Sequence, residues 1–540
     1  MASTSNVDDF DSRYLIVHPE NGGMVDLLRY LLLGDISSGV KFLEAEAEAV
    51  PVLVVEEAAD HRWVIAVSII ARKIIGFLAK PMEYTGFVVD FTLNLLSQNG
   101  NIFGLLYSLL HGKVVIPRRG TETFLSTIGQ LDGRIDLYKG QYLTEQLRYS
   151  DVGQSGIEME LVNRILMDLC IMASKLAYEN AEVVRNVVVD HWKMHFVDFY
   201  NCWNDFEKEM STQVFILTDK PKDATLILIS FRGTEPFDAD DWCTDFDYSW
   251  YEIPKLGKVH MGFLEALGLG NRADTVTFQN HLLGKEAKFR DRSSDSEELP
   301  STGNDCIPPG KMELTAYYAV KNKLKSLLEE HKKAKFVVTG HSLGGALAIL
   351  FPTVLVLHDE MEIMHSLLGV YTFGQPRIGN ERIGRFMKAH LESPVQKYFR
   401  VVYCNDMVPR LPYDDKTFSY KHFGVCLFYN SCYIEQFAFF LVMIFFFFSI
   451  ACIFKKVDEE PNKNFFGLRY LIPVYLNALW ELIRSLTMGY THGPQYKEGW
   501  FSIFARILGL AFPGISAHCP TDYVNSVRLG KERTIQMSSF

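Results

Sequence analysis

A serine between two glycines, in Gly340-His341-Ser342-Leu343-Gly344, is the feature of this sequence with the clearest chemical potential. Apolar residues at 336–338 and 346–350 flank it, so the pattern predicts a buried strand, a sharp turn and a helix. Such a turn strains its central residue and brings the residues two positions away so close together that they must lack a β-carbon. It presents Ser342 Oγ as a nucleophile and points the Leu343 N–H at any oxyanion formed there. The alternative is a glycine-rich turn with an incidental serine.

A serine nucleophile needs a base and an acid that orients the base, and the candidates are His518 and Asp406. Asp406 follows the strand predicted at 397–403, although aspartates in such loops are also common turn formers or helix caps. His518 lies in a loop after the last predicted helix, from which it can reach the sheet edge. His422 is its rival, but it falls in a predicted strand and fits a structural role better. The order Ser342, Asp406, His518 is typical of this kind of turn.

Upstream of the serine, the strand predicted at 225–231 runs into Arg232-Gly233-Thr234. A strand that ends in glycine and then a hydroxyl residue offers a backbone N–H beside a side-chain OH, so Thr234 joins Leu343 as an oxyanion-hole candidate. On its own, the motif also fits a plain turn. The segment 235–250 mixes aromatic residues with aspartates, which favours an amphipathic flap that is polar on one side and apolar on the other, or else a surface segment packed on the core.

Around these motifs, predicted strands alternate with helices of moderate length. Strands are expected at 213–218, 225–231, 367–373 and 397–403, and helices at 157–178, 313–331 and 381–390. This alternation predicts an α/β fold with a mostly parallel sheet covered on both faces. In such sheets the chemistry gathers at the carboxyl ends of the strands, where the candidate residues lie.

Two further regions are strongly apolar. Between 63 and 110, short apolar runs are each interrupted before the ~20 residues of a spanning helix, a pattern typical of helices in a lipid interface. Core packing is the alternative. Phe437–Phe454 has 18 consecutive residues without a charge, which could span a membrane, form a hairpin or lie on a lipid surface. We therefore divide the chain into a lipid-associating region, 1–150, and a domain, 151–540, that carries a membrane-associating insertion at about 430–510.

Composition narrows the functional classes. The chain has 540 residues, 48% of them apolar, and a net charge of −11, which excludes global disorder and argues against a nucleic-acid partner. Its nine cysteines contain no Cys-x-x-Cys pair, so we expect neither a zinc site nor a disulfide framework. This cysteine usage is typical of a protein in a reducing compartment. The polar, acidic start is not typical of a cleaved signal peptide.

Taken together, these motifs resemble the class 3 lipases, which share a fold with the fungal triacylglycerol lipases. The resemblance rests on the serine motif, on Arg232-Gly233-Thr234, on 371–380 (Tyr-Thr-Phe-Gly-Gln-Pro-Arg-Ile-Gly-Asn) and on 405–412 (Asn-Asp-Met-Val-Pro-Arg-Leu-Pro). It covers about 200–425 and the histidine at 518. With the apolar N-terminal region and the phenylalanine-rich insertion, nearly the whole chain looks like the plant oil-body triacylglycerol lipases. The long interval between Asp406 and His518 departs from the compact family members.

The resemblance implies an α/β-hydrolase core, with apolar helical regions that associate with lipid, and hydrolysis of storage glycerides by Ser342, Asp406 and His518. It also implies attachment to the cytosol-facing surface of lipid droplets, and it implies no metal or organic cofactor. Three alternatives stay open: a phospholipase or galactolipid lipase with the same triad, a catalytically retired scaffold, and a membrane-bound structural protein. The expected partners are an acylglycerol substrate and a lipid-droplet or membrane surface, while protein partners stay open.

Overall fold

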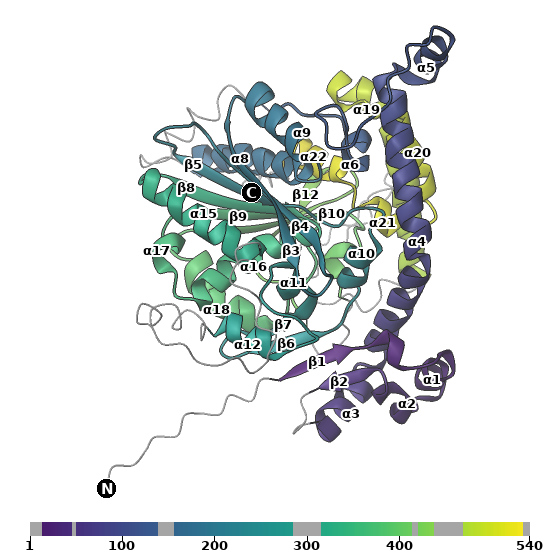
Figure 1. The fold of residues 1–540 in the computed structure, drawn as a ribbon, viewed down its shortest axis with the longest axis vertical. Coiled ribbons are helices and arrows are strands. Elements are labelled where there is room, and N and C mark those ends of the chain that lie inside the picture. The colour runs from purple at the N-terminus through teal and green to yellow at the C-terminus, as the bar shows by residue number, and fades with distance from the viewer. Residues whose placement is uncertain are drawn as a thin grey trace, which may run out of the picture.

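A mixed β-sheet with helices on both faces forms the centre of the molecule (Figure 1). The computed structural model describes residues 13–45, 50–138, 156–283, 315–412, 420–436 and 468–532. From one edge to the other, the strands are β13 (Lys531–Glu532), β12 (Ile434–Gln436), β11 (Val425–Tyr429), β10 (Tyr398–Tyr403), β9 (Leu367–Phe373), β8 (Lys335–His341), β5 (Leu226–Phe231), β4 (Glu209–Thr218) and β3 (His195–Asn204). The run from β5 to β11 is parallel, and antiparallel β4 and β3 extend it. The predicted α/β class with a mostly parallel sheet is confirmed.

Strand β8 illustrates how the sheet is buried. Phe336 and Val338 pack into a core shared with α16 (Leu343–Leu357) and α15 (Ala316–Glu330). Val337, between them, packs into a second core with α8 (Gly156–Leu176) on the opposite face. Successive side chains of a strand point to opposite faces, so an unbroken apolar run fits a strand that is covered on both sides.

Shorter helices complete the layers around the sheet and its N-terminal extension. They are α1 (Met24–Leu28), α2 (Ile36–Val40), α3 (Val50–Asp60), α5 (Asn101–Leu110), α6 (Thr127–Leu131), α9 (Ala181–Asn186), α10 (Ala239–Asp245), α11 (Met261–Ala266), α12 (Val276–Leu282), α17 (Met361–Met364), α18 (Glu381–Leu391) and α21 (Pro513–Ser516).

The N-terminal region shares a second, smaller sheet with the rest of the chain. Its strands, in order, are β2 (Leu43–Ala45), β1 (Tyr14–Val17), β6 (Trp250–Ile253) and β7 (Gly257–His260). Because β1 pairs with β6, the start of the described chain is joined by backbone hydrogen bonds to the segment that follows α10.

The apolar runs predicted between 63 and 98 form one continuous helix, α4 (Arg62–Gln98), rather than several. Charged residues do not interrupt it because they find partners in the protein: Arg72 donates to Asp247 Oδ1 over 2.9 Å, and Lys73 donates to a backbone carbonyl. Within the described ranges, every helix falls short of the combined length and hydropathy that a bilayer span requires.

The predicted secondary structure around the two candidate histidines, His422 and His518, is wrong. Residues around His422 form no strand, because the chain pairs with β10 only from Val425 onward, after a glycine with positive φ. His518 does not follow the last helix but precedes one more, α22 (Pro520–Leu529). The sequence conceals α22 because buried polar residues, including Asp522 and Asn525, interrupt its apolar stripe.

The predicted insertion contains two long helices, α19 (Leu468–Thr491) and α20 (Trp500–Gly509). The run Phe437–Phe454 lies outside the described residues. In Figure 1, α19 and α20 lie on the same side of the molecule as α4. Short α6 contacts both α4 and α20, which connects the N-terminal helix to the insertion.

Helix α4 also packs closely against the loop that leads into α10. A β-carbon built on Gly86 would lie 2.7 Å from Cβ of Phe237, whereas one built on Gly76 would meet nothing within 4 Å. The two glycines occupy the same helix, so they form a matched pair for testing this contact.

We expect Gly86→Ala to lower the thermal unfolding midpoint and Gly76→Ala to raise it. Alanine improves helix propensity at both positions by about 0.5–1 kcal/mol. At position 86 the methyl group overlaps Phe237, and overpacking of this kind costs about 1–3 kcal/mol. Thermal unfolding followed by circular dichroism measures both variants. Equal shifts in the two proteins would contradict the close packing of α4 on this loop.

Candidate active site

Ser342 lies on the predicted sharp turn between β8 and α16. Its backbone has φ 57° and ψ −132°, a conformation that costs energy for a residue with a β-carbon. A β-carbon on Gly340 would lie 2.1 Å from the carbonyl oxygen of Gly344, so this turn excludes any larger residue at 340. The strain is held in place by the buried strand and the buried helix on either side.

Asp406 and His518 form a buried hydrogen-bonded pair. His518 Nδ1 lies 2.7 Å from Asp406 Oδ2, although 112 residues separate them in the chain. Asp406 is fully buried and its ionised carboxylate only accepts, so Nδ1 carries the hydrogen. In the neutral ring Nε2 then has a free lone pair, and this buried atom has no hydrogen-bond partner among the described residues. A base with a fixed tautomer results.

Two further groups fix the Asp406 carboxylate. The backbone N–H of Val408 donates to Oδ1 over 2.9 Å, and the Tyr523 hydroxyl donates to Oδ2, the oxygen that also accepts from His518. Tyr523 lies on α22, four residues beyond Cys519, the N-cap of that helix. The sequence analysis missed it, because nothing in the local pattern distinguishes it from a core tyrosine.

The histidine lies beside the serine turn. The Ser342 N–H donates to the carbonyl of Phe373 over 2.9 Å, and a β-carbon on the next residue, Gly374, would lie 2.7 Å from His518 Cε1. Gly374 has φ +60°, so glycine is favoured there by its backbone as well as by the imidazole. The end of β9 thus contacts both Ser342 and His518.

His341, inside the serine motif, holds the backbone of His518. Its Nε2 lies 3.0 Å from the carbonyl oxygen of His518, which can only accept, so Nε2 carries the hydrogen. Burial, aided by the nearby His518, lowers the pKa of His341 well below its ordinary value. The ring is therefore neutral, and Nδ1 accepts from the Tyr178 hydroxyl over 2.8 Å. The position of His341 within the motif was the available signal for this role.

The strand end that carries Thr234 reaches the serine turn, and Leu343 directly follows Ser342 in that turn. A β-carbon on Gly233 would lie 2.3 Å from the carbonyl of His341 and 3.0 Å from Cβ of Ser342, so the end of β5 touches the turn. The Thr234 hydroxyl donates to Asp245 Oδ2 over 3.0 Å. Leu343 begins α16, where backbone N–H groups lack intrahelical acceptors.

The site is closed in this structure. Ser342 is 2% exposed. Asp245, whose carboxylate accepts from Thr234, is the last residue of α10, which packs against α4. A cleft of about 570 Å³ opens between α4 and the loop before α10, and its lining includes Tyr178 and Phe237. Ser342 is therefore out of reach of a bulky ester in this conformation.

His422, the rival candidate for the base, is not paired with Asp406. Its Nε2 donates to the carbonyl of Pro409 over 2.7 Å, and burial lowers its pKa well below the ordinary value. The Asp406 carboxylate is taken by His518, so the structure pairs only one of the two candidate histidines with the aspartate. Within the described residues, no group of three or more His, Cys, Asp and Glu side chains is arranged to hold a metal ion.

The chain is similar in sequence to known proteins over nearly its whole length. Residues 228–416 match the family model for lipase (class 3). The chain is 59% identical to a Nicotiana tabacum protein named triacylglycerol lipase OBL1, over 98% of this chain and 96% of that protein. An Arabidopsis thaliana protein of the same name is 61% identical, over 98% and 97%. A solved Rhizomucor miehei lipase–propeptide complex is 20% identical with a TM-score of 0.31, over 51% of this chain and 70% of that one. The chain therefore belongs to the class 3 lipase family and is a serine ester hydrolase.

Proposed function

We propose that this protein hydrolyses the ester bonds of triacylglycerols, with Ser342 as nucleophile, His518 as base and Asp406 as the acid that orients the base. The observation that carries the proposal is the 2.7 Å contact between His518 and Asp406 beside the strained serine turn. The printed name of the two plant relatives supports the substrate class.

In the proposed reaction, Ser342 Oγ attacks the ester carbonyl while His518 Nε2 accepts its proton. Asp406 stabilises the resulting imidazolium, which then protonates the departing glyceride oxygen. His518 then accepts a proton from the water that attacks the acyl-enzyme. It returns this proton to Ser342 Oγ as the bond between the acyl group and the serine breaks and the fatty acid leaves. Each half-reaction returns His518 to its neutral form. His518 therefore accepts and then donates the proton in each of the two steps.

The backbone N–H groups of Thr234 and Leu343 are proposed to stabilise the tetrahedral oxyanion. Loss of one such donor typically raises a barrier by about 2.7–4 kcal/mol. Because the Thr234 hydroxyl is tied to Asp245, movement of α10 and placement of this donor are coupled. We propose that the segment 235–250 is a lid that opens at a lipid surface.

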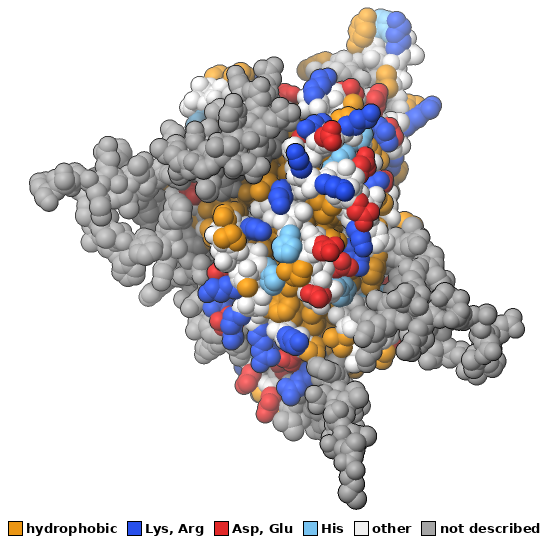
Figure 2. Space-filling model, turned by 90° about the vertical axis from the view of Figure 1, so that its left-hand side faces the viewer, with side chains coloured by type: hydrophobic (Ala, Val, Ile, Leu, Met, Phe, Trp, Pro, Cys, Tyr) orange, Lys and Arg blue, Asp and Glu red, His pale blue; other side chains and the backbone are white. Residues whose placement is uncertain are grey.

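We further propose that the protein acts at the surface of lipid droplets. The support is an apolar wall of exposed side chains on the side of α4, α5, α19 and α20, which includes Phe77, Tyr84, Phe103, Leu110, Leu486 and Phe504. Apolar surface costs about 25 cal/mol per Å² in water, and a large exposed patch marks a binding surface. Figure 2 views the side of the molecule away from α4, where acidic and basic side chains are interspersed among apolar ones.

The first experiment measures fatty acid released from emulsified triolein by the full-length protein. We expect Ser342→Ala and His518→Ala to lower the rate by at least about 10³-fold, because each removes a group that the triad needs. His422→Ala should keep most of the activity. A serine-reactive phosphonate should label the wild type and not Ser342→Ala.

Two results would change this proposal. Loss of activity in His422→Ala together with retention in His518→Ala would overturn the choice of base. Release of fatty acid from a phospholipid or galactolipid, with none from triolein, would replace the substrate class and leave the triad in place.

Charge added to the apolar wall should weaken lipid binding. We expect the triple variant Phe77→Glu, Phe103→Glu, Leu110→Glu to float with phospholipid-coated triolein droplets at least about 10-fold less than the wild type, since each fully buried side chain contributes about 1.5–3 kcal/mol. Hydrolysis of dissolved p-nitrophenyl butyrate should be unchanged.

The matched control carries the same charge change on exposed apolar residues outside the wall, Met210→Glu, Val276→Glu, Val395→Glu. It should float like the wild type. Equal loss of flotation in both triple variants would show that the wall does not direct binding.

Asp245 should make the folded protein less stable as the pH rises. Burial raises its pKa to about 7, against the opposing effects of the Thr234 hydrogen bond and the nearby His518. The folded state thus retains a proton that the unfolded chain releases near pH 4, so stability is lost between about pH 4 and pH 7. Asp245→Asn removes this loss. Its melting temperature should rise relative to the wild type from pH 4 to pH 8, and a constant difference would refute the raised pKa.

A further inference from the structure

Helices α19 and α20 turn apolar side chains outward and charged side chains inward. Their exposed residues include Ile483, Leu486, Tyr490, Phe504, Ile507 and Leu508. On the inner faces, Arg484 of α19 and Arg506 of α20 are buried. A surface helix normally has the opposite arrangement, and a buried arginine is unfavourable unless its charge is paired.

Both arginines converge on Asp522 of α22. Arg484 Nη2 lies 2.9 Å from Asp522 Oδ1, and Arg506 binds both carboxylate oxygens, at 3.0 and 3.1 Å. The hydroxyl of Tyr433 donates to Oδ1 over 2.8 Å. Burial raises the pKa of Asp522, but Arg506 and Arg484 outweigh it, so the pKa lies below its ordinary value. All three donors belong to the predicted insertion.

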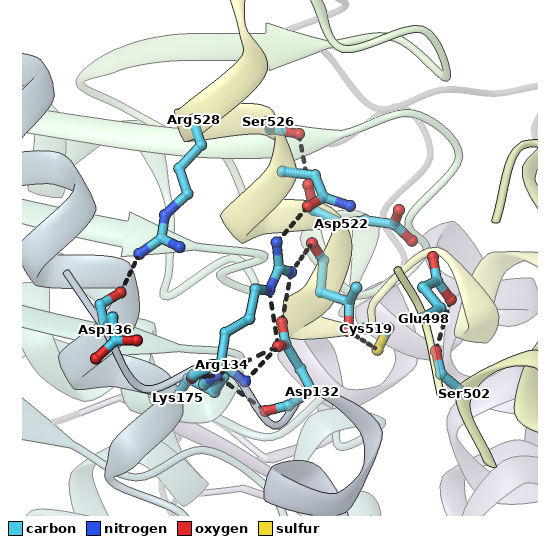
Figure 3. Close-up of polar contacts among 12 residues, drawn as sticks. Asp132, Arg134, Asp136, Lys175, Glu498, Ser502, Cys519, Asp522, Ser526 and Arg528 are labelled. Atoms are coloured by element: carbon cyan, nitrogen blue, oxygen red, sulfur yellow. Dashed lines mark hydrogen bonds and ion pairs between the residues drawn. The ribbon is translucent and has the colours of Figure 1, made fainter. Parts of the chain in front are cut away.

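Arg506 is itself held in a single orientation. Glu498, just before α20, accepts from Nε and from Nη2 of Arg506, each over 2.8 Å, and also from the Ser502 hydroxyl over 2.6 Å. Figure 3 shows Glu498 and Ser502 near Asp522 of α22. A bidentate arginine with two carboxylate partners fixes geometry as well as charge. The distance from α20 to α22 is therefore tightly set.

Helix α22 connects the ion pairs of Asp522 to the candidate active site. Its N-cap residue, Cys519, directly follows His518, and Tyr523, next to Asp522, donates to Asp406. The remote end of α22 is tied elsewhere: Arg528 pairs with Asp168 of α8 over 2.6 Å and reaches the Asp136 carbonyl, as Figure 3 shows. One helix thus has two separate buried anchors.

We propose that Asp522 is a positioning residue for ester hydrolysis, through which α19 and α20 hold His518 and Tyr523 against Asp406. The proposal rests on the proposed function, in which His518 and Asp406 are the base and its orienting acid. It makes the two helices that form part of the apolar wall a component of the catalytic centre. Contact of these helices with lipid and the alignment of the histidine then depend on the same buried charges.

The test substitutes Asp522→Asn in the full-length protein and follows dissolved p-nitrophenyl butyrate, whose hydrolysis does not require a lipid surface. Misplacement of a catalytic group by about 1 Å lowers a rate by about 10²-fold, so we expect kcat to fall about 10- to 100-fold. KM should change by less than about twofold, since the substrate contacts remain. Tyr433→Phe removes the hydroxyl that donates to Asp522 and accepts from Asn525, but removes no charge, and should lower kcat by about 3- to 10-fold.

The matched control is Asp168→Asn, which leaves Arg528 of α22 without its carboxylate partner, as Asp522→Asn does for Arg484 of α19. It should lower the melting temperature, as Asp522→Asn does, and keep the wild-type kcat below the unfolding transition. Tyr433→Phe decides the question if Asp522→Asn does not fold.

A wild-type kcat in Asp522→Asn or in Tyr433→Phe would overturn the proposal, and so would an equal loss of kcat in Asp168→Asn. Failure of the proposed function gives a different result, because the wild type itself would then hydrolyse no ester and its Ser342 would not react with the phosphonate.

Discussion

The buried carboxylate of Asp406 is the constraint on which the arrangement of the site depends. A fully buried negative charge must be surrounded by donors, since an uncompensated one is unfavourable by several kcal/mol. Val408 supplies one donor within the same loop, whereas His518 and Tyr523 arrive from the far end of the chain. The end of β10 therefore determines where the segment around α21 and α22 must pack. The same hydrogen bonds fix the tautomer of the candidate base.

The segments packed around and near Ser342 come from distant parts of the sequence. Ser342 is buried, and Thr234, at the end of the neighbouring strand, donates to Asp245 of α10. Helix α10 packs against α4, which also bears exposed residues such as Phe77. Arg72 of α4 pairs with Asp247, just after α10, so the two helices are linked by charge as well as by packing. If the segment 235–250 acts as the proposed lid, these contacts would transmit a movement of α4 to it.

Helices α19 and α20 of the insertion expose apolar residues and bury charged ones, which is the reverse of an ordinary surface helix. Their outer faces are apolar, which suits a lipid surface, while their inner faces carry Arg484 and Arg506 against Asp522. Only a few of their apolar residues, such as Met488, are buried against the protein, so apolar packing contributes little to holding these helices in place. Buried ion pairs attach them instead, and ion pairs constrain direction and distance more strictly than apolar contacts do.

The sequence by itself determined the parts of this protein whose causes are local. Two glycines around Ser342 between an apolar strand and an apolar helix specify a strained turn, and strands alternating with helices specify the parallel core. Tertiary structure alone decided that α4 is one helix, that α22 exists and that His341 and Tyr523 hold the histidine and the aspartate. The partners of Asp522 lie 38 and 16 residues away in the chain, at Arg484 and Arg506. Local periodicity reports which face of an element is apolar, but the partner of a buried charge is chosen only when distant segments meet.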